Sequence, residues 1–165
     1  TDGLFLETFR RVAKEYPQIE SEDFMVDATA YYLVTDPERF DVIVTMNQYG
    51  DILSDLCAGL VGSLGIAAGA NIGDQCAIFE ACHGSAPDIA GKHLANPTSL
   101  ILSAVMMLRH LNLFQQADLV ENSVREVLME GKHITRDIGG TATTEEYVEA
   151  LIERIREKCQ NRGKI

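Results

Sequence analysis

The sequence predicts an α/β fold, because segments with the pattern of strands alternate with segments with the pattern of helices. An apolar run over residues 40–46 has the character of a buried strand, and residues 52–61 follow it with apolar positions at helical spacing. A second strand-like run covers residues 76–81 and precedes the remaining helical segments. No internal repeat or low-complexity tract is present. At 165 residues we expect one large domain or two smaller ones.

The elements expected in the first part of the chain follow from periodicity and from proline. The first helix has an apolar stripe at helical spacing and ends at Pro17, and the second stops before Pro37. The segments expected, in order, are a helix over 4–16, a strand over 24–27, a helix over 28–34, a strand over 40–46 and a helix over 52–61.

In the second part, terminal signals define the helices. Asn96 and Pro97 suit the N-cap and first position of a largely apolar, buried helix. Gly131 suits the C-terminal end of an amphipathic helix, and Thr143 to Glu146 form a capping box. The expected order is a glycine-rich loop over 62–73, a strand over 76–81, a loop over 83–95, and helices over 98–111, 117–130 and 145–158.

The composition excludes some classes of function. A net charge of −11 argues against nucleic acid and against anionic membrane surfaces as partners. No apolar run reaches transmembrane length, and no signal peptide is visible. The four cysteines lack C-x-x-C spacing, so we expect reduced, mostly buried thiols in an intracellular protein. The chain begins in helix-like sequence, which suggests a segment upstream of Thr1.

The most informative motif is Asn47-Gln-Tyr-Gly-Asp-Ile-Leu-Ser-Asp55, where a strand is expected to pass into a helix. Asp51 and Asp55 are four residues apart and therefore share a helical face, where two carboxylates repel. A divalent cation would offset that repulsion, because hard cations prefer carboxylate oxygen. The alternative is that Asp51 lies in the first helical turn, favoured by the helix dipole, and that Asp55 is a solvated surface residue. A Mg²⁺-dependent phosphotransfer site is a further alternative, but the sequence offers no phosphate-cradling loop.

A second group of polar residues lies after the strand over 76–81. The loop contains His83, suited to packing on an adenine ring, and Asp88, suited to accepting hydrogen bonds from a ribose diol. The negative charge of Asp88 would repel a 2′-phosphate and so favours NAD over NADP. The alternative is an ordinary connecting loop, since such residues are common in loops. No G-x-G-x-x-G follows a strand, so a standard Rossmann site is excluded.

Together these motifs resemble the β-decarboxylating dehydrogenases, the family of isocitrate, homoisocitrate, isopropylmalate and tartrate dehydrogenases. The resemblance runs nearly from end to end of the chain. The motifs that carry it are Asn47–Asp55, Gly59-Leu-Val-Gly-Ser-Leu-Gly65, Gly69-Ala-Asn-Ile-Gly73, Phe79-Glu-Ala-Cys-His-Gly-Ser-Ala-Pro-Asp-Ile-Ala-Gly91, Ala95-Asn-Pro-Thr98 and Met106-Met-Leu-Arg-His110.

The resemblance implies roles for individual residues. Asp51 and Asp55 match metal-binding aspartates, and Asp27 matches an acidic residue that reaches the metal site of a neighbouring subunit. Eight residues fall in the family's nucleotide-binding stretch: Glu80, His83, Gly84, Ser85, Ala86, Asp88, Ile89 and Asn96. No catalytic residue is visible, because the family's lysine and tyrosine, and its basic substrate clamp, are expected upstream of Thr1.

The resemblance implies the C-terminal half of the isocitrate/isopropylmalate dehydrogenase fold. Residues 1–61 would be part of a small, dimer-forming and metal-binding domain, and residues 62–165 part of a large, nucleotide-binding domain. The motifs over 69–73 and 79–81 favour an isocitrate dehydrogenase, and Asp88 with Ile89 favours an NAD-using one. Regulatory subunits of some eukaryotic NAD enzymes in this family carry Asn in place of the helix aspartates. This chain has both, Asp51 and Asp55, so a catalytic-type subunit is expected.

The expected activity is oxidative decarboxylation of isocitrate to 2-oxoglutarate with NAD and Mg²⁺ or Mn²⁺, as part of a longer or complemented enzyme. The 165-residue chain alone is expected to be inactive. The expected assembly is a homodimer or a hetero-oligomer of family subunits, in the cytoplasm or the mitochondrial matrix. The alternatives are a fragment of an isopropylmalate or homoisocitrate dehydrogenase, and a non-catalytic, truncated nucleotide-binding or dimerisation paralogue.

Overall fold

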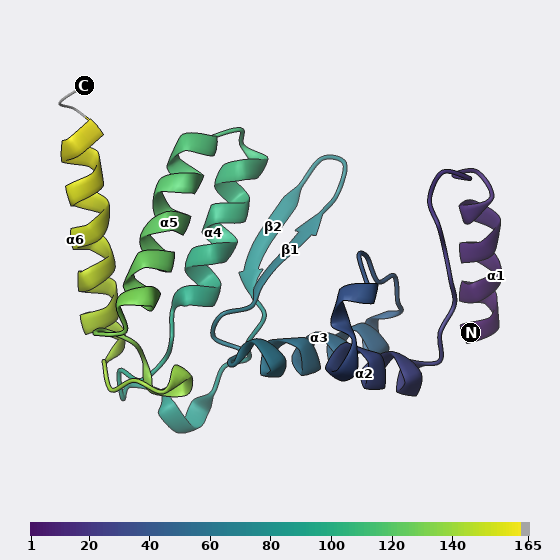
Figure 1. Ribbon diagram of the computed structural model, residues 1–165, viewed down its shortest axis with the longest axis horizontal. Coiled ribbons are helices and arrows are strands. Elements are labelled where there is room, and N and C mark those ends of the chain that lie inside the picture. The colour runs from purple at the N-terminus through teal and green to yellow at the C-terminus, as the bar shows by residue number, and fades with distance from the viewer. Residues whose placement is uncertain (163–165) are drawn as a thin grey trace. The chain divides into compact units, whose positions relative to one another are not determined.

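The computed structural model describes residues 1–162, and the chain divides into two compact units between Leu60 and Val61. The first unit contains three α-helices and one 3₁₀ turn (Figure 1). Their bounds are α1 Asp2–Ala13, α2 Val26–Thr35, η1 Pro37–Arg39 and α3 Asn47–Val61. The expected helices over 4–16, 28–34 and 52–61 are therefore present, with earlier starts for all three.

An aromatic cluster fixes the turn between α2 and the segment that follows it. The Arg39 guanidinium lies 4.2 Å from the ring centroid of Tyr32 and 4.8 Å from that of Phe24. Phe24 in turn packs edge-on against Tyr32 and Phe40. Each cation–π contact at such a partly exposed site contributes about 0.5–1 kcal/mol.

Two strands expected in the first unit are absent. The expected strand over 24–27 is wrong, because α2 already begins at Val26. The expected buried strand over 40–46 is also wrong: these residues form no strand, and Val42 and Val44 are 79% and 58% exposed. A strand needs neighbours that pair with its N–H and C=O groups, and within residues 1–162 no segment pairs with this one.

The second unit is a β-hairpin followed by three helices. β1 Ala68–Ile72 pairs antiparallel with β2 Ala77–Ala81, with Gly69 opposite Glu80. The glycine-rich segment over 62–73 was expected to be loop throughout, and β1 corrects that expectation. The loop over 83–95 contains only the short turn η2 Pro87–Ile89. The remaining elements are α4 Thr98–His110, α5 Phe114–Glu130, η3 Arg136–Ile138 and α6 Thr144–Arg162.

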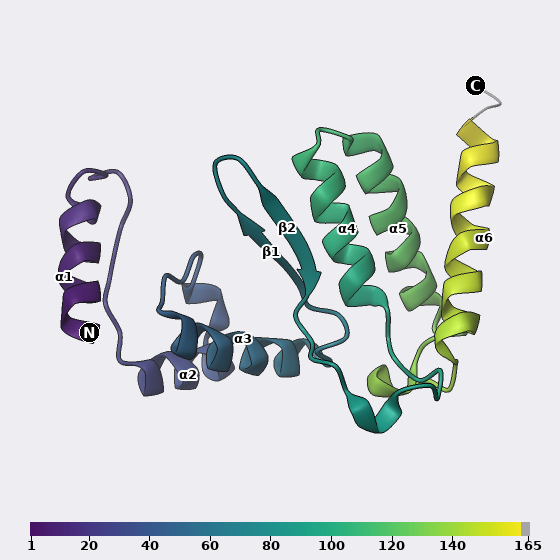
Figure 2. The ribbon, with the colours of Figure 1, turned by 180° about the vertical axis from the view of Figure 1, so that it is seen from behind.

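The elements of the second unit lie side by side in a row. Figures 1 and 2 show the hairpin beside α4, α4 beside α5, and α5 beside α6. The core of the row lies between α5 and α6, where Val124 and Val127 meet Tyr147 and Leu151. The Thr98 hydroxyl donates to the buried Tyr147 hydroxyl at 2.8 Å and so ties α4 to this core.

Serine hydroxyls of helix α4 bind the backbone of the hairpin and the residues that flank it. Ser103 Oγ donates to Glu80 O at 2.7 Å and accepts from Gly69 N at 3.3 Å. Ser99 Oγ donates to Ala67 O and accepts from Cys82 N at 3.3 Å. These bonds satisfy backbone groups on the hairpin that would otherwise need a third strand. The expectation of an all-round buried α4 is only partly met, because Leu100 is 58% exposed.

The helix-terminal signals of α5 and α6 are confirmed, whereas that of α4 is displaced by one residue: Pro97, expected at the first helical position, is the N-cap, and Asn96 precedes it. Gly131 takes a left-handed conformation, with φ of 68°, at the end of α5. In the capping box, the Thr143 backbone N–H donates to Glu146 Oε2 at 2.8 Å, and the Glu146 N–H donates back to Thr143 Oγ1 at 3.2 Å. By contrast, the cysteines are not mostly buried: Cys76, Cys82 and Cys159 are exposed, and Cys57 is half-buried. Over residues 1–162, none of the helices combines the length and apolarity needed to cross a bilayer.

Candidate functional site

Helix α3 presents Asp51 and Asp55 to solvent. Both residues are exposed, whereas Leu53 and Ala58 form the buried side of the helix. The helix begins at Asn47, so Asp51 lies beyond its first turn. The alternative that the helix dipole explains Asp51 therefore loses its basis. The pair is left as two like charges one helical turn apart, which is unfavourable in the absence of a cation.

Asp27 is placed differently from the sequence expectation. It lies in the first turn of α2, not at the end of a strand. Its Oδ1 accepts a hydrogen bond from the Ala28 backbone N–H at 2.8 Å, and the helix dipole favours a carboxylate at this position. Within residues 1–162, no three acidic, His or Cys side chains gather closely enough to hold a metal ion. Asp27 thus does not join Asp51 and Asp55 inside one chain.

The donor set nevertheless has the chemistry of a Mg²⁺ or Mn²⁺ site. Asp51 and Asp55 are exposed carboxylates on one helix face, and oxygen ligands of this kind are what hard divalent cations take. Two carboxylates leave most of an octahedral shell to water, substrate or a further carboxylate. The pair therefore fits an incomplete, open metal site.

Most of the expected nucleotide-binding residues lie together where β2 ends. Glu80 is in β2, and its Oε1 accepts a hydrogen bond from Asn71 Nδ2 at 2.7 Å across the hairpin. His83 is exposed, with Nδ1 2.9 Å from Gly84 O. Ala86 has a φ of 41°, a left-handed conformation that turns the chain into η2. The residues from His83 to Asp88 are thus presented on one exposed loop.

The two residues expected to select the cofactor both lie in η2. Asp88 is exposed, and none of the described residues forms an ion pair with it, so its charge is directed to solvent. Ile89 is half-buried. A carboxylate exposed in this way can accept two hydrogen bonds from a diol and repels a phosphate. The chemistry of this loop fits an unphosphorylated ribose.

Asn96 is buried, unlike the rest of the expected nucleotide-binding set, and is only 7% exposed. Its Oδ1 accepts from the Thr98 backbone N–H at 3.0 Å at the start of α4, and its Nδ2 donates to Asp137 Oδ2 at 2.9 Å. The same carboxylate oxygen accepts from Ser63 Oγ at 2.5 Å. We call these three residues, Ser63, Asn96 and Asp137, the amide clamp.

Gly65 leaves the space in which the residues of the amide clamp form their hydrogen bonds. A Cβ at this position would lie 2.8 Å from Asn96 Cβ and 3.1 Å from Asp137 Oδ2. The Gly65 N–H donates to Ser63 Oγ at 2.9 Å, and its carbonyl accepts from the Ser99 N–H at 2.7 Å. The glycine-rich segment after α3 is therefore packed against the end of the loop over residues 83–95.

Asp137 was missed by the sequence analysis. The only local signal is its place in Arg136-Asp-Ile-Gly-Gly140, a composition typical of a turn. Burial would raise the pKa of the Asp137 carboxyl, but the hydrogen bonds it accepts, including those from Ser63 and Asn96, outweigh burial and lower the pKa. Asp137 is therefore a carboxylate, an acceptor only, at neutral pH.

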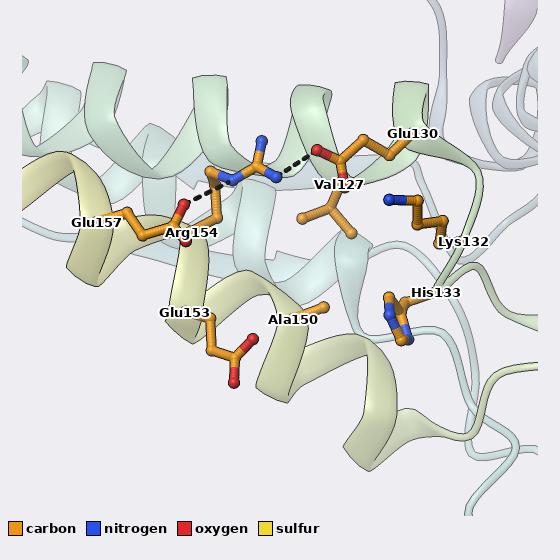
Figure 3. Close-up of a pocket in the computed structure, with 8 residues that line it drawn as sticks. All are labelled: Val127, Glu130, Lys132, His133, Ala150, Glu153, Arg154 and Glu157. Carbon is orange, nitrogen blue, oxygen red and sulfur yellow. Dashed lines mark hydrogen bonds and ion pairs between the residues drawn. The ribbon is translucent and has the colours of Figure 1, made fainter.

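A small pocket at the C-terminal end of α5 does not belong to this site. It measures about 140 Å³ (Figure 3) and is lined by Val127, Glu130, Lys132, His133, Ala150, Glu153, Arg154 and Glu157. Arg154 crosses it and pairs with Glu130 and, at 3.4 Å, with Glu157. The Arg154 guanidinium is thus ion-paired with neighbouring glutamates, and the pocket is a surface hollow beside this ion-pair network.

Comparison with known proteins identifies the family of this chain. The family model described as isocitrate/isopropylmalate dehydrogenase matches residues 1–151. The chain is 52% identical over 158 residues to a protein of Dictyostelium discoideum that is named as a regulatory subunit of mitochondrial NAD isocitrate dehydrogenase, covering 95% of this chain and 45% of that protein. It is 54% identical over 158 residues to 3-isopropylmalate/3-methylmalate dehydrogenase of Methanocaldococcus jannaschii, covering 96% and 47%.

The fold agrees with solved structures. The crystal structure of isocitrate dehydrogenase from Methylococcus capsulatus superposes with a TM-score of 0.89 at 52% identity, covering 93% of this chain and 46% of that one. The chain thus spans slightly less than half the length of these relatives. This partial coverage is consistent with the C-terminal half of the fold. The chain belongs to the isocitrate/isopropylmalate dehydrogenase family.

Proposed function

We propose that a longer protein carrying this chain oxidises and decarboxylates isocitrate with NAD and a divalent metal ion. The observation that carries the proposal is the combination of an unneutralised Asp51/Asp55 pair on α3 with an exposed loop that presents Asp88. The first fits a hard cation, and the second fits the ribose of an unphosphorylated dinucleotide.

The chain contributes binding and orientation to this reaction. When bound, a nicotinamide cofactor would supply the hydride acceptor for the oxidation, and a divalent cation would supply the Lewis acid for the decarboxylation. Asp51 and Asp55 would hold the cation and leave ligand positions for the oxygens of the substrate. The loop from His83 to Ile89 would hold the nucleotide, with Glu80 and Asn96 at its two ends. The lysine, tyrosine and basic clamp would come from outside the 165 residues.

The two units would divide these tasks. Residues 1–61 would belong to a small domain that holds the metal and forms a dimer, and residues 62–165 to a large domain that binds the nucleotide. In a two-fold dimer each chain would supply Asp27 to the metal site of its partner, which gives two equivalent sites. The partner would be a second copy or a related family member, since the Dictyostelium relative is named for a regulatory role in a mitochondrial NAD enzyme.

The full-length protein is expected to reduce NAD with isocitrate and Mn²⁺, whereas the 165-residue chain alone is expected to be inactive. The reason is that the family resemblance places the proton-transfer groups, and the basic clamp that a tricarboxylate requires, outside these 165 residues. NADH appearance with both purified proteins checks this expectation. Steady turnover by the isolated chain would contradict the assignment of the essential groups to an upstream segment.

A different substrate of the same family is the second candidate. The chain is as similar to a relative named for isopropylmalate as to one named for isocitrate, so identity does not choose between them. The same assay with isopropylmalate and homoisocitrate decides the substrate. Turnover with none of the three, by a full-length protein that still binds NAD, would favour a non-catalytic paralogue.

Asp88→Lys combined with Ile89→Tyr is expected to shift the preference of the full-length protein from NAD toward NADP. The substitution replaces a charge that repels the 2′-phosphate with one that binds it, and a charge-assisted hydrogen bond contributes ~1.5–3 kcal/mol. That corresponds to a roughly 10- to 100-fold change in the ratio of kcat/KM for the two cofactors. Asp118→Asn, which removes a half-buried α5 carboxylate that pairs with Arg109 and is not among the proposed site residues, serves as control. An unchanged ratio in the double variant would mean that Asp88 does not face the ribose.

A further inference from the structure

The amide clamp fixes which way round the Asn96 side chain lies. An amide can bind with either end exchanged unless its neighbours distinguish oxygen from nitrogen. On one side Asn96 meets the Thr98 backbone N–H, which can only donate; on the other it meets the Asp137 carboxylate, which can only accept. Both contacts require Oδ1 toward α4 and Nδ2 toward Asp137.

Asp137 is itself held in place from a third direction. Ser63 Oγ accepts from the Gly65 N–H, so its single hydroxyl proton is directed to Asp137 Oδ2. Asp137 comes 41 residues after Asn96, and Ser63 lies 74 residues before Asp137. Three segments distant in the sequence thus meet at one carboxylate oxygen, Asp137 Oδ2, which accepts from both Ser63 and Asn96. Such a polar arrangement orders a site as well as stabilising a fold.

We propose that Asp137 is a positioning residue for the nucleotide, acting through the Asn96 amide at the end of the nucleotide loop. The inference rests on the proposed nucleotide-binding function of that loop. Asn96 Nδ2 has two N–H groups, and only one is used by Asp137. With its orientation fixed, the amide offers a defined donor to the bound base. Without Asp137, the Asn96 amide is free to rotate. Nucleotide binding must then also restrict this rotation, which lowers the affinity.

The test is a double-mutant cycle on the Kd for NAD, measured by titration of the full-length protein. Asp137→Asn keeps the size of the side chain but replaces an acceptor-only group with one that also donates, and we expect it to weaken NAD binding about tenfold. Asn96→Ala should weaken binding by a similar or larger factor. In the double variant, Asp137→Asn should not weaken NAD binding beyond the effect of Asn96→Ala, because Asp137 acts on the nucleotide only through the Asn96 amide.

The controls separate positioning from a general effect on structure. Asp118→Asn should leave the Kd for NAD unchanged, and the Kd for Mn²⁺ should change little in Asp137→Asn, although the loss of a charge-assisted hydrogen bond should lower the melting temperature of that variant. Unaltered NAD binding in Asp137→Asn would overturn the inference, and so would additive effects in the double variant, which would mean direct contact with the nucleotide. If the wild-type protein itself bound no NAD, the proposed function would fail first.

Discussion

Asp55→Asn in the full-length protein is expected to weaken Mn²⁺ binding by on the order of 100-fold and to depress turnover accordingly. The substitution removes one of the two carboxylates that would hold the cation and leaves an amide oxygen, a weaker ligand for a hard ion. The fold should remain intact, because Asp55 is exposed. Relief of the repulsion from Asp51 should even stabilise metal-free α3 by a few tenths of a kcal/mol.

Mn²⁺ titration and steady-state rates measure the first effect, and thermal unfolding without metal measures the second. Asp41→Asn is a matched control, since it removes an exposed carboxylate of the same unit that is not among the proposed ligands. Equal Mn²⁺ affinity in Asp55→Asn and wild type would show that Asp55 of α3 does not bind the metal ion.

Gly140→Ala is expected to destabilise the second unit by at least about 3 kcal/mol. A Cβ at Gly140 would lie 1.9 Å from Ile134 O and 2.5 Å from Ile134 C, so backbone must move. Ile134 O also accepts the Ala142 N–H at 3.0 Å, and the Gly140 N–H donates to Thr135 O at 2.9 Å. Displacing this turn would disturb Asp137 at its centre as well as lower the free energy of unfolding.

The neighbouring glycine gives a sharp control for this effect. Gly139 has a φ of 88° but has open space where a Cβ would be placed. Gly139→Ala should therefore cost only the left-handed backbone penalty of about 1–2 kcal/mol. Urea unfolding of both variants in the full-length protein compares them. A Gly140→Ala variant no less stable than Gly139→Ala would show that the turn accommodates a Cβ there.

Features set by a few neighbouring residues could be predicted from the sequence. The capping box of Thr143 and Glu146 and the left-handed Gly131 depend on local hydrogen bonds and on backbone sterics, and both are present. The exposed Asp51 and Asp55 follow from helical spacing in the same way. Local rules therefore accounted for the helices and for the face of α3 that carries the proposed ligands.

Features that depend on distant partners could not be predicted. Residues 40–46 have the composition of a buried strand, yet no described segment pairs with them. The strand β1 was expected to be loop because the segment over 62–73 is rich in glycine. Its one glycine, Gly69, allows close approach of the two strands, since a Cβ there would lie 3.1 Å from Glu80 O. Asp137 lies 41 residues from Asn96, and no spacing rule connects them.

The most direct test of the account is complementation between two inactive variants. Asp27→Asn and Asp55→Asn chains, each in the full-length protein, are purified, refolded together and assayed with isocitrate, NAD and Mn²⁺. If Asp27 of one chain completes the site built by Asp51 and Asp55 of another, a mixed dimer has one site with all three wild-type aspartates. We expect activity to return in proportion to the mixed dimers formed. Mixtures that exchange subunits and yet regain no activity would contradict a metal site shared between two chains.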